Sequence, residues 1–305
     1  MKILFVGAGG VGGYFGARLF KAGADVTYLL REQRHQKIRS EGLTIETPKE
    51  TFTVQPKTVT KDQLTPIYDL IILAPKAFDL ASALDSISLA SRHGVILPLL
   101  NGLSHLQVLD DKFGRDRVMG GVAHIAAMLT EAGAVRQLTD LHALTVGPRS
   151  AAHAPLAKAF YALCETAGFD HTYSENIEQS LWDKWIFLAT LAGMTTLCRG
   201  TVGDIVAAPW GTEIMRKFFG ECCAIAQAQG FPMKESARTR SLDQLTKQGS
   251  TFTASMLRDL RSGKMTEHSH ILGEMVQRGV DKDIACDLLK AAHTHLVVEH
   301  SHRSS

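Results

Sequence analysis

A glycine-rich segment near the N-terminus could bind a ligand through its backbone: Gly7-Ala8-Gly9-Gly10-Val11-Gly12. The segment fits the pattern Gly-x-Gly-x-x-Gly, follows an apolar run and opens a helical pattern, as dinucleotide-binding loops do. In such loops the first glycine permits a tight turn, the second lets the backbone approach a pyrophosphate, and the third lets helix and strand pack closely. The following helix adds N–H donors and a partial positive charge. We therefore predict a dinucleotide site; a glycine turn without a ligand is the alternative.

Two arginines after the second apolar run indicate which dinucleotide this is. Sites for NAD usually carry an acid here, which accepts a hydrogen bond from the ribose 2′-hydroxyl. This chain instead has Arg31, with Arg34 nearby. Arginine is a permanent cation whose planar fork matches a 2′-phosphate. Glu32, the next residue, is negatively charged and argues against a phosphate here, and both arginines could instead be solvated loop charges. The pattern as a whole favours NADP(H).

Three more polar residues lie where a ligand could reach them. Lys76 and Asn101 each follow an apolar run, and open α/β sheets bind ligands at the carboxyl ends of their strands. Lys184 lies inside an otherwise apolar helical stretch, residues 182–191, where partial burial would lower its pKa toward a useful range. Each residue also has a non-functional interpretation. Lys76 could be a loop charge, Asn101 could form a turn with Gly102, and Lys184 could extend its ammonium to solvent.

The elements that must position these residues follow from the hydrophobic pattern. Four nearly continuous apolar runs are typical of strands buried on both faces, as in a parallel sheet covered by helices. They span residues 3–6, 26–30, 70–74 and 95–100. Helical patterns at residues 12–22 and 78–91 lie between them, and residues 134–138 and 143–146 are further strand candidates.

The second half of the chain has a helical pattern. Its predicted helices span residues 152–167, 177–197, 210–229, 234–247, 265–278 and 284–298. An α/β half followed by an all-α half is a common plan for a cofactor domain joined to a substrate domain. We place the boundary near residues 169–175, which gives a cofactor domain over residues 1–170 and a helical substrate or dimerisation domain over residues 171–305.

Composition excludes several classes of partner. The 33 Lys+Arg and 31 Asp+Glu residues leave a formal net charge of +2, which offers no general basis for binding nucleic acid or a membrane surface. The five cysteines contain no Cys-x-x-Cys pair and suit a reducing compartment. Without an apolar stretch of about 18 residues to span a membrane, we expect a cytoplasmic protein.

Four histidines near the C-terminus indicate a solvated helix end rather than a metal site: His293, His295, His300 and His302.

Taken in order, a set of motifs resembles those of the ketopantoate reductase family over nearly the whole chain. They are Gly7-x-Gly9-x-x-Gly12, Arg31, Ala74-Pro75-Lys76-Ala77, Asn101-Gly102, Leu181-Trp182-Asp183-Lys184, Ser255-Met256-Leu257-Arg258-Asp259 and Thr266-Glu267. The resemblance implies an α/β Rossmann domain followed by an all-α C-terminal domain, with the active site in the cleft. It further implies reduction of 2-dehydropantoate (ketopantoate) to pantoate with NADPH, a step of pantothenate biosynthesis.

The same resemblance implies roles for five residues. Lys184 would be the general acid, Asn101 would bind the substrate and the nicotinamide ribose region, and Lys76 would line the cleft near the cofactor. Ser255 would contact the substrate carboxylate, and Glu267 would position the substrate or the lysine. These roles suit hydride transfer to a ketone, because the alkoxide that develops needs a nearby cation or proton donor. Taken alone, Glu267 could be a first-turn helix acid and Ser255 a solvated polar residue.

The chain departs from the family pattern at four positions that usually carry Asn or Asp. Leu188 and Ala192 follow Lys184 on one helical stripe, and Ser269 and Leu272 follow the glutamate. Each hydrogen bond lost to a polar substrate costs about 1–3 kcal/mol if a group is left unpaired. We therefore hypothesise that the small-molecule substrate is a 2-oxo acid with a less polar tail than ketopantoate.

Two other functions stay open on the sequence alone. A dinucleotide-binding sensor or catalytically degenerate paralogue would explain Leu188 and Ala192, whereas Lys184, Asn101 and Glu267 argue against it. A second alternative is a reductase from a neighbouring branch that also pairs a Rossmann domain with a helical domain and acts on 3-hydroxyacids or polyol phosphates. The motifs from Ser255 to Glu267 argue against that branch. Helical substrate domains often dimerise, so a homodimer is compatible with the sequence, which does not demand one.

Overall fold

The structure, a computed structural model, describes residues 1–304. It divides into two compact units. The first unit holds Met1–Leu100 and His105–Ser180, and the second holds Asn101–Ser104 and the chain from Leu181 onward. A four-residue segment early in the chain thus belongs to the second unit.

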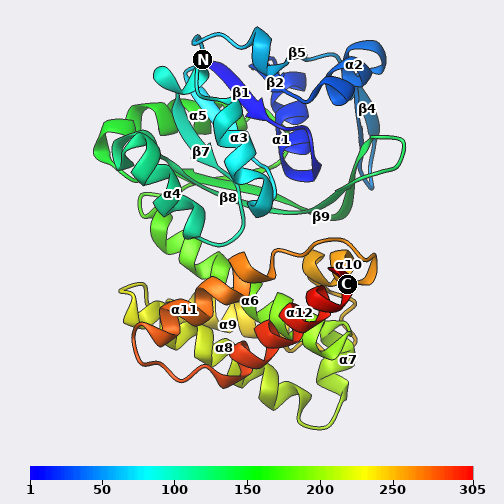
Figure 1. The fold of residues 1–305 in the computed structure, drawn as a ribbon, viewed down its shortest axis with the longest axis vertical. Helices are drawn as coiled ribbons and strands as arrows, with labels where there is room; N and C mark the ends of the chain where they lie inside the picture. The colour runs from blue at the N-terminus through cyan, green and yellow to red at the C-terminus, as the bar shows by residue number, and fades with distance from the viewer. Residues whose placement is uncertain (305) are drawn as a thin grey trace. The chain divides into compact units, whose positions relative to one another are not determined.

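The first unit is built on a five-stranded parallel sheet in the order β5-β2-β1-β6-β7 (Figure 1). Its strands are β1 (Lys2–Val6), β2 (Asp25–Leu29), β5 (Lys57–Val59), β6 (Leu70–Leu73) and β7 (Val95–Pro98). The four predicted apolar runs therefore form four of its five strands, β1, β2, β6 and β7, which confirms the expected parallel sheet. Because the chain moves from β1 to β2 on one side and later to β6 on the other, the strand order reverses at β1, where such folds bind ligands.

A second sheet completes the first unit, in the order β10-β9-β3-β4 with β8 paired to β9. Its strands are β3 (Leu43–Glu46), β4 (Thr51–Val54), β8 (Gly120–Leu129), β9 (Val135–Gly147) and β10 (Asp170–Tyr173). The two strands predicted at residues 134–138 and 143–146 are one strand, β9. Polar residues interrupt its apolar pattern, but the β8 pairing continues past them with a register shift between Ile125 and Ala127.

Helix α1 (Gly10–Lys21) packs against strands of both sheets. Its small side chains make this possible, because a Cβ at Gly13 would lie 2.8 Å from a Val135 methyl on β9, and one at Gly16 would lie 2.2 Å from the Tyr28 hydroxyl on β2. Fully buried aromatic side chains fill the surrounding core: Phe5, Tyr14, Phe15, Tyr28 and Phe160. The glycine-rich helix is therefore a packing element as well as part of the predicted cofactor loop.

The other helices of this unit are α2 (Glu32–Glu41), α3 (Leu80–Ser86), α4 (Ser104–Phe113) and α5 (Ala154–Cys164). The helix predicted at residues 78–91 was too long, since α3 is short and flanked by single 3-10 turns. Serine hydroxyls explain this interruption. Ser86 donates to the Ala83 carbonyl at 2.7 Å and Ser91 to the Ser88 carbonyl at 3.1 Å, and such local hydrogen bonds compete with a helix.

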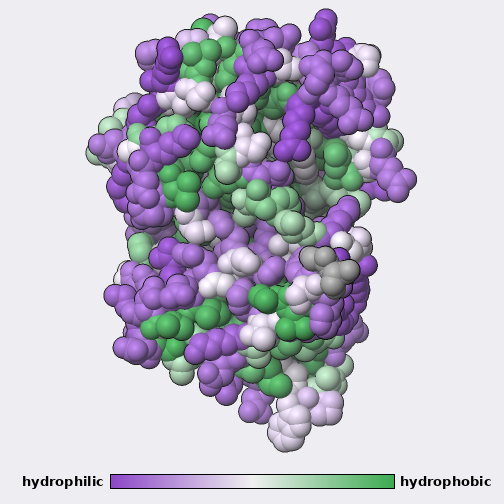
Figure 2. All heavy atoms as spheres, in the orientation of Figure 1, coloured by the Kyte–Doolittle hydropathy of each residue, from purple (hydrophilic) through white to green (hydrophobic). Residues whose placement is uncertain are grey.

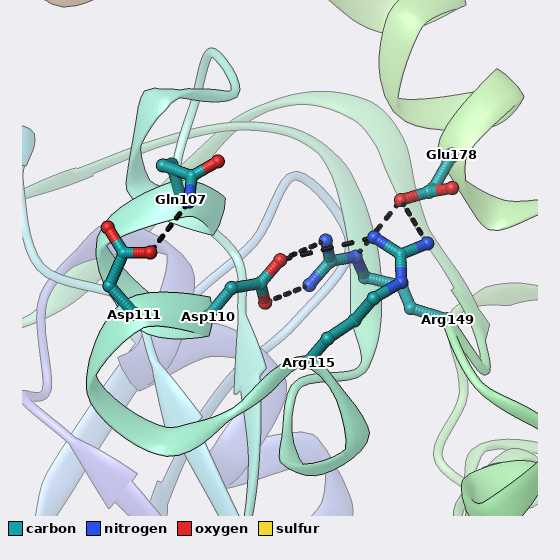
Figure 3. A network of polar contacts seen from close by, with 6 residues as sticks. All are labelled: Gln107, Asp110, Asp111, Arg115, Arg149 and Glu178. Atoms are coloured by element: carbon teal, nitrogen blue, oxygen red, sulfur yellow. Dashed lines mark hydrogen bonds and ion pairs between the residues drawn. The ribbon is translucent and has the colours of Figure 1, made fainter.

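An ion-pair network around the buried Arg149 side chain fixes the segment after β9 (Figure 3). The Arg149 side chain is only 3% exposed and donates to both carboxylate oxygens of Asp110 on α4, at 2.6 and 2.7 Å. It also lies 3.3 Å from Glu178, in the first turn of α6 (Ile177–Cys198), which Arg115 contacts at 2.9 Å. Arg149 thus joins three segments of the first unit that are far apart in the sequence.

The second unit is helical, as predicted. After α6 it contains α7 (Val202–Ala207), α8 (Gly211–Ala228), α9 (Glu235–Leu245), α10 (Ser255–Arg261), α11 (Glu274–Val280) and α12 (Asp287–Ser304). Helix α8 packs against α7, α9, α11 and α12, and its Phe218 and Phe219 are fully buried. The helix predicted at residues 265–278 is instead a π-helical turn, Ser269–Gly273, followed by α11.

The surface of the molecule is mixed. Figure 2 shows polar and apolar side chains interspersed over the visible face. Within residues 1–304, none of the helices has the length and apolar character needed to cross a membrane. The five cysteines are free, and only Cys198 among them is exposed.

Candidate active site

The glycine loop connects β1 to α1 at the point where the strand order reverses. Gly7 has a φ of +90°, a backbone conformation that side-chain-bearing residues rarely adopt, and its N–H donates to the Leu29 carbonyl of β2 at 3.0 Å. Gly9 is the N-cap of α1. The loop therefore turns tightly and presents the N-terminus of α1 at the carboxyl edge of the sheet.

The other glycines fit a bound pyrophosphate. A Cβ at Gly12 would lie 2.7 Å from the Gly7 carbonyl oxygen and 3.2 Å from Ala74 after β6, so this glycine permits the close packing of helix and strand. A Cβ at Gly9 would meet nothing within 4 Å, so the backbone there is open to an approaching ligand. With the helix N-terminus behind it, this open backbone suits a dinucleotide phosphate.

The two arginines after β2 differ in their surroundings. The Arg31 side chain is 80% exposed and pairs with Asp79 at 3.0 Å. Arg34 instead donates to the Ala8 carbonyl of the glycine loop at 3.3 Å, and burial lowers its pKa. Arg34 therefore supports the loop, whereas Arg31 offers its guanidinium at the surface. Lys76, at the end of β6 beside β1, is the N-cap of the 3-10 turn that contains Asp79.

In the second unit, three of the predicted residues form one cluster. The Lys184 ammonium on α6 donates to the Asn101 side-chain oxygen at 3.1 Å. Burial lowers the pKa of Lys184 to about 8, and the carboxylate of Glu267 opposes that shift. Glu267 is itself only 6% exposed. A proton donor with a pKa close to the working pH, held by an amide and balanced by a carboxylate, is suited to general acid catalysis.

Two models of one protein family match most of the chain. Ketopantoate reductase PanE/ApbA matches residues 3–151, and its C-terminal counterpart matches residues 176–298. The chain belongs to the ketopantoate reductase family. It is therefore an oxidoreductase of the 2-dehydropantoate 2-reductase type, and family membership implies a nicotinamide cofactor.

Individual relatives of this ketopantoate reductase family member are distant. The chain is 30% identical over 297 residues to an uncharacterised oxidoreductase, YkpB of Bacillus subtilis, with 97% of this chain and 98% of that protein covered. It is 27% identical to a 2-dehydropantoate 2-reductase of Halobacterium salinarum, with 95% and 96% covered. These identities establish the family and leave the substrate open.

Solved structures of the same fold cover the chain almost completely. A 2-dehydropantoate 2-reductase from Geobacter metallireducens is 26% identical with a TM-score of 0.86, covering 96% of this chain and 98% of that one. A ternary complex of D-mandelate dehydrogenase with NADH and anilino(oxo)acetate is 20% identical with a TM-score of 0.89, covering 100% and 99%. The second likeness concerns the fold alone.

The positions that depart from the family pattern have different surroundings. Leu188 on α6 is half-buried, whereas Ala192 on the same helix and Leu272 in the π-helical turn are fully buried. Ser269 is exposed. Ala192 and Leu272 are therefore parts of the core, and Leu188 is the apolar replacement that keeps some open surface. Ser255 begins α10 and is half-buried.

Two residues beside the cluster, His270 and Ser104, were not predicted from the sequence. The Ser104 hydroxyl oxygen lies 2.8 Å from Nδ1 of His270. Ser104 stands three residues after Asn101, and His270 three residues after Glu267. Nothing in the sequence indicates that these two residues pair, because they lie 166 positions apart.

Three histidines of the second unit pack together near Glu267. The rings of His268 and His300 stack with centroids 4.7 Å apart, and the His293 ring lies 5.7 Å from His268. The Thr266 hydroxyl bridges His268 at 3.0 Å and His300 at 2.9 Å. Burial, with His300 and His293 nearby, lowers the pKa of His268 from 6.5 to about 4. Among residues 1–304, no group of three such side chains could hold a metal ion.

We expect this histidine cluster to make the protein less stable in acid. Between pH 6.5 and about 4 the unfolded chain binds a proton that folded His268 does not, so the free energy of unfolding falls as the pH falls through that window. Urea unfolding at several pH values in this range would measure the slope of the free energy of unfolding against pH. The slope should decrease in His268→Phe and stay unchanged in His93→Asn, whose histidine is exposed. An unchanged slope in His268→Phe would show that the cluster is not responsible.

Proposed function

We propose that the protein reduces 2-dehydropantoate to pantoate with NADPH, as a step of pantothenate biosynthesis. The observation that carries the proposal is the Lys184–Asn101–Glu267 cluster, because it couples a lysine of lowered pKa to an amide acceptor and a buried carboxylate. The names of distant 2-dehydropantoate 2-reductases support the same substrate. A degenerate paralogue would have no need to keep such a cluster.

The chain would hold the cofactor through residues of the first unit. The open backbone at Gly9 and the N-terminus of α1 suit the pyrophosphate, and Arg31 suits the 2′-phosphate. When bound, the reduced nicotinamide supplies the hydride that converts the ketone carbon to an alcohol.

The cluster in the second unit would supply the proton. The Lys184 ammonium donates it to the ketone oxygen as negative charge develops there, which stabilises the transition state. The Asn101 oxygen orients the ammonium, and Glu267 counters the effect of burial and so keeps Lys184 protonated near neutral pH. Ser255, at the start of α10, would contact the substrate carboxylate.

We expect Arg31→Ala to weaken NADPH binding selectively. Loss of one charge-assisted hydrogen bond, about 1.5–3 kcal/mol, corresponds to about a 10–100-fold rise in the Kd for NADPH, with the Kd for NADH nearly unchanged. Asp79→Asn should act in the opposite direction, because Asp79 now pairs with Arg31 at 3.0 Å and repels a phosphate. Fluorescence titration with both cofactors measures these effects. Arg39→Ala, at an exposed position near the end of α2, is the matched control, and equal losses for NADPH and NADH in Arg31→Ala would contradict the NADP assignment.

A second candidate is the reduction of a 2-oxo acid with a less polar tail. Leu188, one helical turn after Lys184, supports it, because it puts a partly open apolar side chain where the family usually has an amide. The same fold also serves D-mandelate dehydrogenase, so the fold alone does not select the substrate.

The deciding experiment follows the loss of NADPH absorbance with purified protein. Ketopantoate would be compared with branched and aromatic 2-oxo acids under identical conditions. The highest kcat/KM on ketopantoate supports the first candidate, and a clear preference for an apolar 2-oxo acid supports the second. No turnover on any of them, with NADPH binding intact, would refute both and favour a degenerate paralogue.

A further inference from the structure

The ring of His270 packs against the turn that carries Asn101. Nδ1 and Nε2 of His270 lie 2.8 and 3.3 Å from the Ser104 hydroxyl oxygen, at one end of the segment Asn101–Ser104. At the other end, the backbone of Asn101 forms a hydrogen bond with the same ring. One imidazole thus spans all four residues of this segment.

The middle of the turn is equally close to His270. Gly102 has a φ of +74°, and a Cβ there would lie 3.0 Å from the His270 carbonyl oxygen and 3.1 Å from Cδ2 of its ring. The turn therefore has little room to move toward the ring, and any larger residue at position 102 would displace it. Asn101 and His270 are packed as one piece.

The π-helical turn Ser269–Gly273 aims His270 in this direction. The His270 N–H donates to the Glu267 carbonyl at 3.1 Å, so the histidine is tied by its backbone to the acidic member of the cluster. The charged groups that act on its ring are Glu267 and Glu274, and burial outweighs both and lowers the pKa of His270. The ring is therefore neutral at neutral pH and acts as a fixed hydrogen-bonding group. Such π-helical turns often occur at functional sites.

We propose that His270 is a positioning residue that holds the Asn101–Ser104 turn so that the Asn101 oxygen stays on the Lys184 ammonium. The inference rests on the proposed function in one respect, that Lys184 is the proton donor. Its effect passes through Asn101, whose oxygen lies 3.1 Å from Nζ of Lys184. Without His270 the turn loses hydrogen bonds at both ends, and the ammonium loses the acceptor that favours its charged form.

Two substitutions separate positioning from proton transfer by His270 itself. His270→Ala removes both hydrogen bonds and should lower kcat by up to about 100-fold, as expected when a catalytic group is misplaced. His270→Asn puts an amide nitrogen close to the place of Nδ1 but cannot titrate, so it should recover most of that loss. A His270→Asn enzyme as inactive as His270→Ala would overturn the proposal.

A double-substitution cycle tests the route through Asn101. If His270 acts only by holding Asn101, the variant with both His270→Ala and Asn101→Ala should have the kcat of Asn101→Ala alone. If the two losses multiply instead, His270 acts by another route and the proposal is wrong. His295→Asn, at a half-buried histidine on α12 of the same unit, is the matched control and should leave kcat unchanged.

The pKa of Lys184 provides a readout that needs no substrate. Carbon NMR of methylated lysines, with the Lys184 signal identified by its absence in Lys184→Met, would give that pKa directly. It should fall below the wild-type value in His270→Ala and return in His270→Asn; an unchanged value in His270→Ala would overturn the inference. If no 2-oxo acid is turned over, the proposed function fails while this measurement still decides the role of His270.

Discussion

Replacement of Lys184 by methionine is expected to reduce kcat for the preferred 2-oxo acid about 10²–10⁴-fold, the usual contribution of a general acid. Methionine keeps the apolar stem of the side chain within α6 and removes only the proton donor. The Kd for NADPH should change little, because the residues expected to hold its phosphates, the glycine loop and Arg31, belong to the first unit. Steady-state kinetics and fluorescence titration on the same preparations would measure both quantities.

The pH dependence gives the same prediction a second test. Because burial lowers the pKa of Lys184 to about 8 and the protonated form is the active one, kcat of the wild type should fall as the pH rises through about 8. Lys290→Met, at an exposed position on α12, should keep both the rate and this profile. Near-normal turnover in Lys184→Met, or a wild-type profile that is flat across this range, would remove Lys184 from the chemistry.

Substitution of Arg149 by methionine is expected to destabilise the fold by about 3–5 kcal/mol, since it removes two charge-assisted hydrogen bonds of about 1.5–3 kcal/mol each from the half-buried Asp110 carboxylate. Arg149 is 3% exposed and makes two hydrogen bonds to Asp110, at 2.6 and 2.7 Å, and a third contact to Glu178. The midpoint of urea unfolding, followed by circular dichroism, would measure the loss.

A neighbouring arginine offers the matched comparison. Arg115 also contacts Glu178, but its side chain is 50% exposed, so Arg115→Met should cost no more than about 1 kcal/mol. The contrast between the two variants tests burial as the cause, because both remove an arginine from the same network. Equal midpoints for Arg149→Met and Arg115→Met would show that the network contributes little.

Sequence patterns were most informative where burial is complete. Strands β1 and β6 consist almost wholly of apolar residues and are buried at almost every position, so their runs were visible in the sequence. Strands β3 and β4 are four residues long and only partly buried, and β5 is three residues at the edge of the sheet. Such short, half-polar segments carry too little periodicity to distinguish a strand from a loop.

In the candidate site, contacts between residues that are far apart in the sequence were likewise hard to predict. The glycine loop was predictable because its turn, its helix and the strand before it are consecutive in the chain. The hydrogen bond from Lys184 to Asn101 joins positions 83 residues apart, and only the family resemblance suggested that they act together. His270 lay outside that resemblance, and its pairing with Ser104 depends on a π-helical turn that helical periodicity does not predict.

The assignment of Asn101–Ser104 to the second unit also bears on how such proteins can be recombined. A chimera that joined this first half to the C-terminal half of a relative at residue 181 would bring a foreign lysine and glutamate to a native asparagine turn. A fragment that began at Leu181 would lack the turn altogether. Exchange of specificity between relatives would therefore require two pieces of sequence, the long C-terminal segment and a four-residue insert, so the halves are not interchangeable modules.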